Sequence, residues 1–228
     1  MTISGIVKSS FVDYPGLVAC VLFVPGCNYN CYYCHNRSLI DGTHDTISSE
    51  FVDAFLRRRA GLLDGVVISG GEPTLQKDLI AFTEKIGALG YQLKLDTNGS
   101  SPAVVSQLLQ AGLFHYYALD YKAPAERYRE ICRGGADASA VRRTADLLLC
   151  AGIPFEVRTT VIPQLSETDL IHMAKELPVL PRYVLNRYRK PERYLSCDEA
   201  AVEQTPYTHQ QIKSFADLVR PWQPNVTV

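Results

Sequence analysis

The stretch PGCNYNCYYCHN at residues 25–36 concentrates residues that can bind a metal. Cys27, Cys31 and Cys34 lie within it in the spacing C-x3-C-x2-C, in a chain that has seven cysteines in all. Crowded thiols are typical of disulfide frameworks, zinc sites and iron-sulfur clusters. These three kinds of site imply very different proteins, so the choice among them comes first.

Structural zinc sites take four protein ligands, commonly as two separated pairs of residues. The sequence contains no second pair of cysteines at such spacing, although Cys197 or His35 could complete a zinc site. A disulfide would leave one of the three thiols over and would be unusual in a reducing compartment. Three thiolates can instead hold three irons of a [4Fe-4S] cluster and leave the fourth iron open to another ligand. The spacing favours the cluster, with zinc as the remaining alternative.

The composition is typical of one globular domain. With 228 residues, of which 46% are hydrophobic, the chain can bury one full core. A net charge of -1 offers no concentrated basic surface for nucleic acid or an anionic membrane. The sequence contains no apolar run long enough to span a bilayer, and its first residues lack the apolar core of a secretory signal. We therefore expect a cytoplasmic protein that binds neither nucleic acid nor membrane.

Six short apolar runs, rich in β-branched and aromatic residues, end in Gly, Pro, Asn or Asp and are typical of strands. The segments between them have helical spacing. Residues 166–169 and 208–211 have the spacing of capping boxes, and Gly152 is a candidate C-cap. This alternation predicts an α/β protein with a parallel sheet, either doubly wound or an open barrel. The predicted strands lie at residues 17–26, 65–73, 91–99, 115–124, 154–163 and 182–189.

Chemically active residues collect at the ends of these predicted strands. Five of the six ends carry a charged residue, and the first carries a cysteine. In both architectures ligands bind beyond the carboxyl ends of the strands, so these residues are the candidate site. They are Cys27, Gly70, Gly71, Glu72, Asp96, Thr97, Asn98, Asp120, Lys122, Arg158, Thr160, Asn186 and Arg187.

Besides Cys197, three further cysteines lie outside the crowded stretch. Cys20 falls in a predicted strand, Cys150 in a helical segment and Cys132 in the stretch EICRGG. They are too scattered for a second cluster. We expect all three to be small buried residues or bystanders to the chemistry.

Several motifs together resemble those of one enzyme superfamily. C-x3-C-x2-C with Tyr33 just before the last cysteine resembles the signature of the radical S-adenosylmethionine (radical SAM) superfamily, and SGGEP resembles its methionine-binding motif. The stretches FVDYPG, GCNYNCYYCHN, SGGEPTLQ, LDTNGS, ALDYKAP and RTTVIP occur in the order expected of the activating enzymes of glycyl radical enzymes. The chain most resembles the anaerobic ribonucleoside-triphosphate reductase activating proteins and, more distantly, pyruvate formate-lyase activating enzyme.

The resemblance implies a fold and a reaction. The fold is one radical SAM domain over residues 1–228, an open partial (β/α)6 TIM-like barrel of parallel strands, with its core at about 15–190 and a short helical tail at 191–228. The cofactors are a [4Fe-4S] cluster and S-adenosyl-L-methionine. One electron from the reduced cluster cleaves S-adenosylmethionine, and the resulting 5'-deoxyadenosyl radical abstracts a glycine Cα hydrogen from a partner protein.

The same resemblance implies two partners. One is a glycyl radical enzyme, here anaerobic ribonucleotide reductase, and the other is a flavodoxin or ferredoxin-type electron donor. Two alternatives remain at this point. The chain could be a radical SAM enzyme acting on a small molecule or peptide, or a noncatalytic zinc or iron-sulfur binding module.

The resemblance implies a functional role for each motif, and a purely structural explanation is also possible for some of them. The three cysteines of the crowded stretch would bind the cluster. Gly70 and Gly71 would let backbone approach the methionine moiety, and Glu72 would receive its ammonium group, whereas the alternative is a strand-ending turn with a surface Glu. Asp96, Thr97 and Asn98 offer donors and acceptors for a ribose or a cation, although DTNG is also a good turn sequence. In the pyruvate formate-lyase relative the matching Asp and Thr help to hold a monovalent cation, which implies a cation near Asp96.

Two later strands supply charged candidates. Asp120 and Lys122 alternate along a strand and so face the same side, where they are either a structural ion pair or part of the site. We expect a site role, with Lys122 near the cofactor or the incoming backbone and counted with the cysteines among the catalytic candidates. Arg158 and Thr160 also share a face, and Arg158 could meet the cofactor carboxylate.

The remaining candidates are tied to the motifs by resemblance alone. Tyr33 belongs to the cysteine signature and is implied to contact the cofactor. His35 and Asn36 follow the last cluster cysteine, and CHN resembles the activating enzymes specifically. Asp13, in FVDYPG, matches a motif that lies near the bound substrate loop in those enzymes. Asp13, His35 and Asn36 are therefore expected to face the substrate loop.

Overall fold

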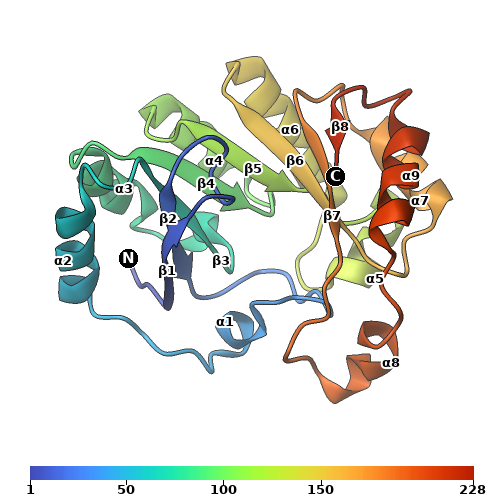
Figure 1. Cartoon of the computed structure of the whole chain (residues 1–228), viewed down its shortest axis with the longest axis horizontal. Helices are drawn as coiled ribbons and strands as arrows, with labels where there is room; N and C mark the ends of the chain where they lie inside the picture. The colour runs from blue at the N-terminus through green and yellow to red at the C-terminus, as the bar shows by residue number, and fades with distance from the viewer. The chain divides into compact units, whose positions relative to one another are not determined.

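The computed structural model describes residues 1–228, and its eight strands form one sheet in chain order, from β1 to β8 (Figure 1). β1 pairs antiparallel with β2, whereas the pairs β2 with β3, β3 with β4, β6 with β7, and β7 with β8 are parallel. The order has two ends, so the sheet does not close into a barrel. The predicted α/β class with an open, mostly parallel sheet is confirmed.

Each of the six predicted strands corresponds to one observed strand. Sequence reasoning missed two further strands, one at each edge of the sheet: β1 ends in polar residues, and β8 has only two residues. The observed strands are β1 Gly5–Ser10, β2 Ala19–Val24, β3 Gly65–Gly70, β4 Gln92–Thr97, β5 Tyr116–Asp120, β6 Phe155–Val161, β7 Tyr183–Arg187 and β8 Val226–Thr227.

Helices occupy most of the connections between the strands. None of them combines the length and the apolar character that a membrane crossing requires. The α-helices are α1 Arg37–Asp41, α2 Ser49–Arg59, α3 Leu79–Gly87, α4 Pro102–Ala111, α5 Tyr128–Cys132, α6 Ala138–Ala151, α7 Glu167–Glu176, α8 Glu199–Val202 and α9 His209–Val219, with short 3-10 turns η1 Pro73–Leu75, η2 Ala125–Arg127 and η3 Ser196–Asp198.

The chain forms two compact units, each assembled from distant parts of the sequence. The first contains residues 1–27, 38–97 and 103–118, and the second contains residues 28–37, 98–102 and 119–228. Their boundaries therefore separate Cys27 from the two cysteines that follow it. The expectation of a single domain stays a prediction.

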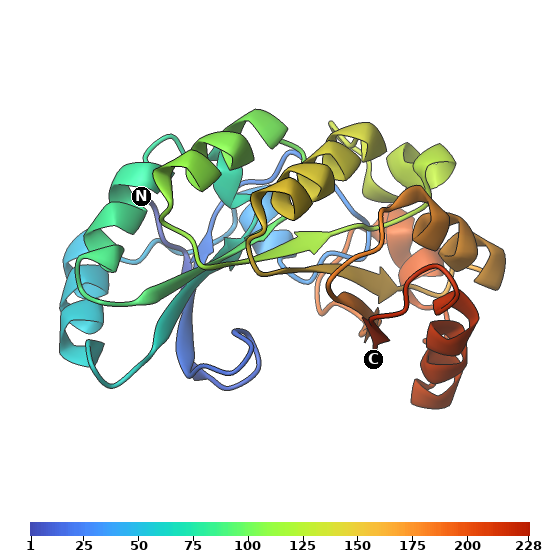
Figure 2. The ribbon, with the colours of Figure 1, turned by 90° about the horizontal axis from the view of Figure 1, so that it is seen from above.

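The first unit is organised around β2 and β3. Both strands are continuous apolar runs, and their paired residues Leu22 and Ile68 are fully buried. Such runs are typical of parallel strands that are covered on both faces. Figure 2 shows α3 and α4 lying along one face of this part of the sheet. The covered strands place their carboxyl ends in fixed register.

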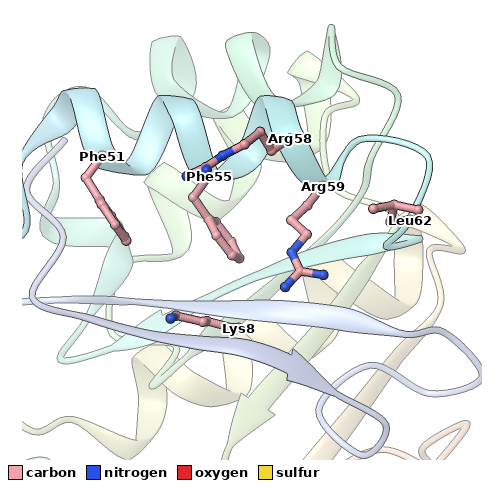
Figure 3. Close-up of a pocket in the computed structure, with 6 residues that line it drawn as sticks. All are labelled: Lys8, Phe51, Phe55, Arg58, Arg59 and Leu62. Atoms are coloured by element: carbon pink, nitrogen blue, oxygen red, sulfur yellow. The ribbon is translucent and has the colours of Figure 1, made fainter.

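A groove of about 390 Å³ lies between α2 and β1 in the same unit. Figure 3 shows Phe51, Phe55 and Arg59 of α2 pointing toward Lys8 on β1. The Arg59 guanidinium carbon lies 6.0 Å from the centre of the Phe55 ring. Arg57, Arg58 and Arg59 at the end of α2 are all exposed.

The second unit contains the end of β5, the strands β6 to β8 and the helices α5 to α9. Two of its helices begin with the predicted capping boxes. Ser166 Oγ accepts from the backbone N–H of Asp169 at the start of α7, and Thr208 and Gln211 form the same motif at the start of α9. α9 packs against α7 and β7, so the tail predicted to be helical lies against this part of the sheet (Figure 1).

Candidate active site

The turn after β3 brings bare backbone close to the segment that precedes the cysteines. The N–H of Gly71 donates to the carbonyl of Val24 at 2.8 Å, and the N–H of Glu72 donates to the carbonyl of Gly26 at 2.7 Å. A Cβ placed on Gly71 would lie 1.9 Å from the Gly26 oxygen. Gly70 has φ of 114°, and a Cβ there would lie 2.5 Å from backbone atoms of Val24. Only glycines fit at these two positions.

The carboxylate of Glu72 is fully buried directly beyond this turn. Its Oε1 accepts from Thr97 Oγ1 at 2.7 Å, from Thr74 Oγ1 at 2.6 Å and from the backbone N–H of Thr74 at 3.1 Å. Glu72 and Thr97 are sequence-predicted site residues, and the structure brings them together. Sequence reasoning missed Thr74, although its place in GGEPT, at the start of η1, was the available signal. The alternative of a surface Glu at this turn is wrong.

Asp96 lies at the end of β4 between two donors. Its Oδ1 accepts from Lys94 Nζ at 2.7 Å, and its Oδ2 accepts from Ser69 Oγ at 3.1 Å. Lys94 is 1% exposed, so its ammonium group is a buried positive charge beside the carboxylate. Sequence reasoning missed both partners. The spacing of two residues between Lys94 and Asp96, which places them on one face of a strand, could have identified the first.

Asn98 is joined to the cysteine loop within the second unit. Its Nδ2 donates to Asn28 Oδ1 at 2.9 Å, and Asn28 Nδ2 donates to Ser100 Oγ at 2.9 Å. The backbone N–H of Ser100 donates back to Asn98 Oδ1 at 2.9 Å. The short segment after β4 therefore holds the beginning of the cysteine loop. Nothing in the sequence indicated Asn28 as a partner, because it is 70 residues away from Asn98.

The cysteine loop carries free thiols. None of the seven cysteines is joined in a disulfide, so no disulfide forms among the three. Cys31 and Cys34 belong to one turn, in which the N–H of Cys34 donates to the carbonyl of Cys31 at 3.2 Å. A hydrogen bond from Cys132 lowers the pKa of Cys31, against the effect of burial, whereas burial raises the pKa of Cys34. Cys31 is therefore the easier of the two to ionise.

Tyr33 lies within this loop as a buried aromatic residue. Its ring meets those of Tyr32 and Tyr188 edge to face, with centres 5.4 Å and 6.5 Å apart. Burial raises the pKa of Tyr33, and its buried hydroxyl makes no hydrogen bond. A buried hydroxyl without a partner is uncommon, and a group bound beside it would supply one. Free thiols beside such a hydroxyl fit an iron-sulfur cluster with a further ligand.

Asp120, Lys122 and Arg158 form one charged group at the ends of β5 and β6. Lys122 Nζ donates to Asp120 Oδ2 at 2.9 Å, and Arg158 Nε donates to Asp120 Oδ1 at 3.0 Å. Burial alone would raise the pKa of Asp120, but the two cations outweigh it and hold this pKa at about 2. Asp120 raises the pKa of Lys122 well above its ordinary value, although burial acts in the opposite direction. All three side chains are therefore charged near neutral pH.

The remaining predicted residues are less enclosed. Thr160 is half-buried on β6, two residues beyond Arg158. His35 is exposed and Asn36 is half-buried, directly after the last cysteine of the triad. Asp13 lies in the turn after β1, where its N–H donates to Ser10 Oγ at 3.2 Å. No three or more His, Cys, Asp or Glu side chains are arranged to hold a single metal ion.

Comparisons of sequence identify the relatives of this chain. Residues 21–177 match the radical SAM superfamily. A Methanocaldococcus jannaschii protein named "Putative glycyl-radical enzyme activating enzyme" is 30% identical over 235 residues, which cover 99% of this chain and 95% of that protein. The match therefore extends over both chains almost from end to end.

Comparisons of structure support the fold. A domain of pyruvate-formate lyase-activating enzyme from Bacteroides vulgatus has a TM-score of 0.57 at 17% identity, covering 72% of this chain and 97% of that chain. Streptococcus suis SuiB bound to S-adenosylmethionine has a TM-score of 0.66 at 15% identity, covering 89% of this chain and 48% of that chain. At such identities the likeness concerns the fold alone, and it agrees with an open TIM-like α/β sheet.

Proposed function

Because this chain belongs to the radical SAM superfamily, we propose that it activates a glycyl radical enzyme, with anaerobic ribonucleotide reductase as the target. The single observation that carries the proposal is the similarity to the Methanocaldococcus jannaschii activating enzyme over 99% of this chain. A shared superfamily signature alone would leave the substrate open, because radical SAM enzymes act on many kinds of molecule. Similarity over the whole chain includes the parts that meet the substrate.

The cofactors supply the radical, and the chain supplies their binding site. A [4Fe-4S] cluster and S-adenosylmethionine, when bound, provide a one-electron cleavage that yields a 5'-deoxyadenosyl radical. In the proposal, Cys27, Cys31 and Cys34 hold three irons of the cluster. Gly70 and Gly71 form the tight turn against Val24 and Gly26 that places Glu72, and the carboxylate of Glu72 receives the ammonium group of the methionine moiety. Thr97 fixes the orientation of that carboxylate through the 2.7 Å hydrogen bond.

The charged group of Asp120, Lys122 and Arg158 has a second role in the proposal. Lys122 and Arg158 are both bonded to Asp120, and this network positions one cation for the cofactor carboxylate or the incoming backbone. Tyr33 would direct its unpartnered hydroxyl toward the bound cofactor. Asn98 and Thr160 contribute further polar contacts to the cofactor, and Asp13, His35 and Asn36 face the loop of the protein substrate.

Three finer parts of the proposal concern the surroundings of the reaction. A monovalent cation near Asp96 would add to the positive charge that Lys94 already provides there. A flavodoxin or ferredoxin-type protein would deliver the electron. The free thiols are suited to the reducing cytoplasm, where we place the protein.

Anaerobic reconstitution tests the chemistry. The protein with iron and sulfide should become brown and hold about four irons per chain, and under a strong reductant it should cleave S-adenosylmethionine. Cys27→Ala, Cys31→Ala and Cys34→Ala should each lose the cluster, whereas Cys150→Ala, which changes an exposed cysteine on α6, should retain it. A colourless protein with one bound zinc would contradict the proposal.

Co-expression with anaerobic ribonucleotide reductase tests the substrate. Electron paramagnetic resonance should then show a stable glycyl radical on the reductase, and the radical should disappear when the reductase glycine is replaced by Ala. Cleavage of S-adenosylmethionine without a radical on the reductase would support the proposed cofactor chemistry. It would contradict the proposal that anaerobic ribonucleotide reductase is the substrate. A radical on another glycyl radical enzyme would identify the true partner.

A further inference from the structure

A basic groove of about 630 Å³ lies at the carboxyl end of β7, within the second unit. Two exposed arginines and the exposed histidine that begins α9 line it, and no Asp or Glu side chain does. The lining residues are Asn186, Arg187, Tyr188, Arg189, Pro206 and His209. The charge of the groove therefore favours a negatively charged ligand.

The two arginines of the groove have no carboxylate partner in the chain. Arg187 Nε donates to the carbonyl of Tyr207 at 3.0 Å, and neither Arg187 nor Arg189 belongs to an ion pair. The carboxylate of Glu203 pairs instead with Lys190, the next residue along the chain. Both guanidinium groups therefore keep N–H donors for a ligand, in a planar fork that matches the geometry of a carboxylate.

The segment that carries Pro206 and His209 is fixed to the rest of the second unit. The Tyr207 hydroxyl donates to the carbonyl of Leu165 at 2.9 Å. The Tyr207 ring meets that of Phe215 on α9 edge to face, with ring centres 4.9 Å apart. A groove with a fixed wall loses less conformational freedom when a ligand binds.

The groove adjoins two parts of the proposed active site. The buried Tyr188 ring meets that of Tyr33, in the cysteine loop, edge to face with ring centres 6.5 Å apart. β7 pairs in parallel with β6, and this pairing places Asn186 opposite Thr160. A segment held in the groove therefore lies beside the cysteine loop and the end of β6.

We propose that this groove docks an acidic segment of the protein substrate, whose Asp or Glu side chains pair with Arg187 and Arg189. The proposal rests on the proposed function, because it takes a glycyl radical enzyme as the substrate. Exposed charge pairs contribute little binding free energy each. The groove therefore steers and orients a partner that the active site also holds, since complementary charges mainly raise the rate and specificity of association.

Anaerobic binding of the reconstituted protein to anaerobic ribonucleotide reductase, followed by biolayer interferometry, tests the docking. Arg189→Glu should raise the dissociation constant at least about tenfold at low salt, because an attraction becomes a repulsion. The difference from wild type should shrink at high salt, since exposed charges are screened. Arg143→Glu, the same charge change on the exposed face of α6, should stay within about twofold of wild type.

A variant that keeps the charge provides a second measurement. Arg189→Lys retains a cation and introduces an amine, which a carbodiimide can couple to a carboxylate of the bound reductase. Mass spectrometry should then find residue 189 linked to an Asp or Glu of the reductase. Arg143→Lys, the matched control on α6, should give no such link.

The outcomes separate this proposal from the proposed function. Wild-type affinity of Arg189→Glu, with normal iron content, would overturn the docking proposal alone. A reductase that binds Arg189→Lys tightly but forms no link through residue 189 would also overturn it. Wild-type protein that neither binds the reductase nor forms a glycyl radical on it would overturn the proposed target instead.

Discussion

Thr97 Oγ1 donates a 2.7 Å hydrogen bond to Oε1 of Glu72, a carboxylate with no exposed surface. Thr97→Val keeps the shape of the side chain but removes this donor from a buried charge. We expect the variant to lose about 2 kcal/mol of unfolding free energy, because hydrogen bonds to charged groups contribute more than neutral ones. Urea unfolding of the metal-free protein measures the loss. Equilibrium dialysis of S-adenosylmethionine on reconstituted protein should show weaker binding.

Thr83→Val is the matched control for this change. Thr83 is also fully buried, but its hydroxyl donates only to the carbonyls of Leu79 and Ile80 within α3. Its loss should destabilise the protein by about 1 kcal/mol and leave cofactor binding unchanged. Equal cofactor affinities for the two variants would argue against the role proposed for Glu72.

Gly71→Ala should be among the most damaging single substitutions in the first unit. The added Cβ would lie 1.9 Å from the Gly26 carbonyl oxygen, and that atom belongs to backbone that cannot move aside without disturbing the cysteine segment. We expect a loss of about 4 kcal/mol or more, or failure to fold. Thermal unfolding followed by circular dichroism measures this.

Gly87→Ala provides the opposite expectation in the same unit. Gly87 is the last residue of α3, and nothing lies within 4 Å of a Cβ placed there. Alanine should stabilise the helix by about 0.5 kcal/mol, because glycine is the poorer helix former. A Gly71→Ala protein as stable as this control would show that the close approach of the two backbone segments is wrong.

Lys94→Met should leave the carboxylate of Asp96 without its buried cation. The Lys94 ammonium lies 2.7 Å from Asp96 Oδ1 and is 1% exposed. Removing one member of a buried ion pair costs about 3 kcal/mol, because the remaining charge stays in a poorly solvated place. Urea unfolding should detect this loss. Lys85→Met, on the exposed face of α3, should change the unfolding free energy by less than about 0.5 kcal/mol.

Asp120→Asn should show a stability effect that depends on pH. The pKa of Asp120 is about 2 in the folded protein against an ordinary value of 3.8, because Lys122 and Arg158 outweigh the effect of burial. A lowered folded pKa means that the carboxylate contributes its full stability above the unfolded pKa. That contribution is lost as the pH falls through about 2.

We therefore expect Asp120→Asn to lose about 2 kcal/mol near pH 7, and the difference from wild type to shrink steadily below about pH 4. Urea unfolding of the metal-free protein at a series of pH values measures it. Asp146→Asn, an exposed change on α6, should show no such trend. A difference for Asp120→Asn that stays constant down to pH 3 would contradict the ion-pair explanation.

Local patterns in the sequence were enough to predict β2 to β7 and several helix ends. The runs around Leu22 and Ile68 are long and apolar because both faces of these strands are covered, and such runs are conspicuous. The capping boxes at Ser166 and Thr208 depend on residues only three positions apart. β1 was missed because GIVKSS lies at an edge, where exposed polar residues weaken the strand pattern.

The contacts of the site join residues that are distant in sequence. Local sequence patterns could not predict such contacts. Asp120 and Lys122 were expected on one face, but the bond from Arg158 joins strands 38 residues apart. Cys132 was expected to be a buried bystander. It is buried, and its carbonyl accepts a hydrogen bond from the backbone N–H of Asn30 in the cysteine loop, a contact that no local pattern predicts because the two residues are far apart in sequence.

The edge strand β1 bears on how the protein behaves at high concentration. An unpaired strand edge is a template for adding a strand from another molecule, and long apolar edges lead to aggregation. Here Lys8 and Ser9 are exposed, and the register of β1 against β2 is irregular between Val7 and Ser10. A charged edge with an irregular register is a poor template for strand pairing. The β1 edge is therefore a poor site for adding a strand from another molecule.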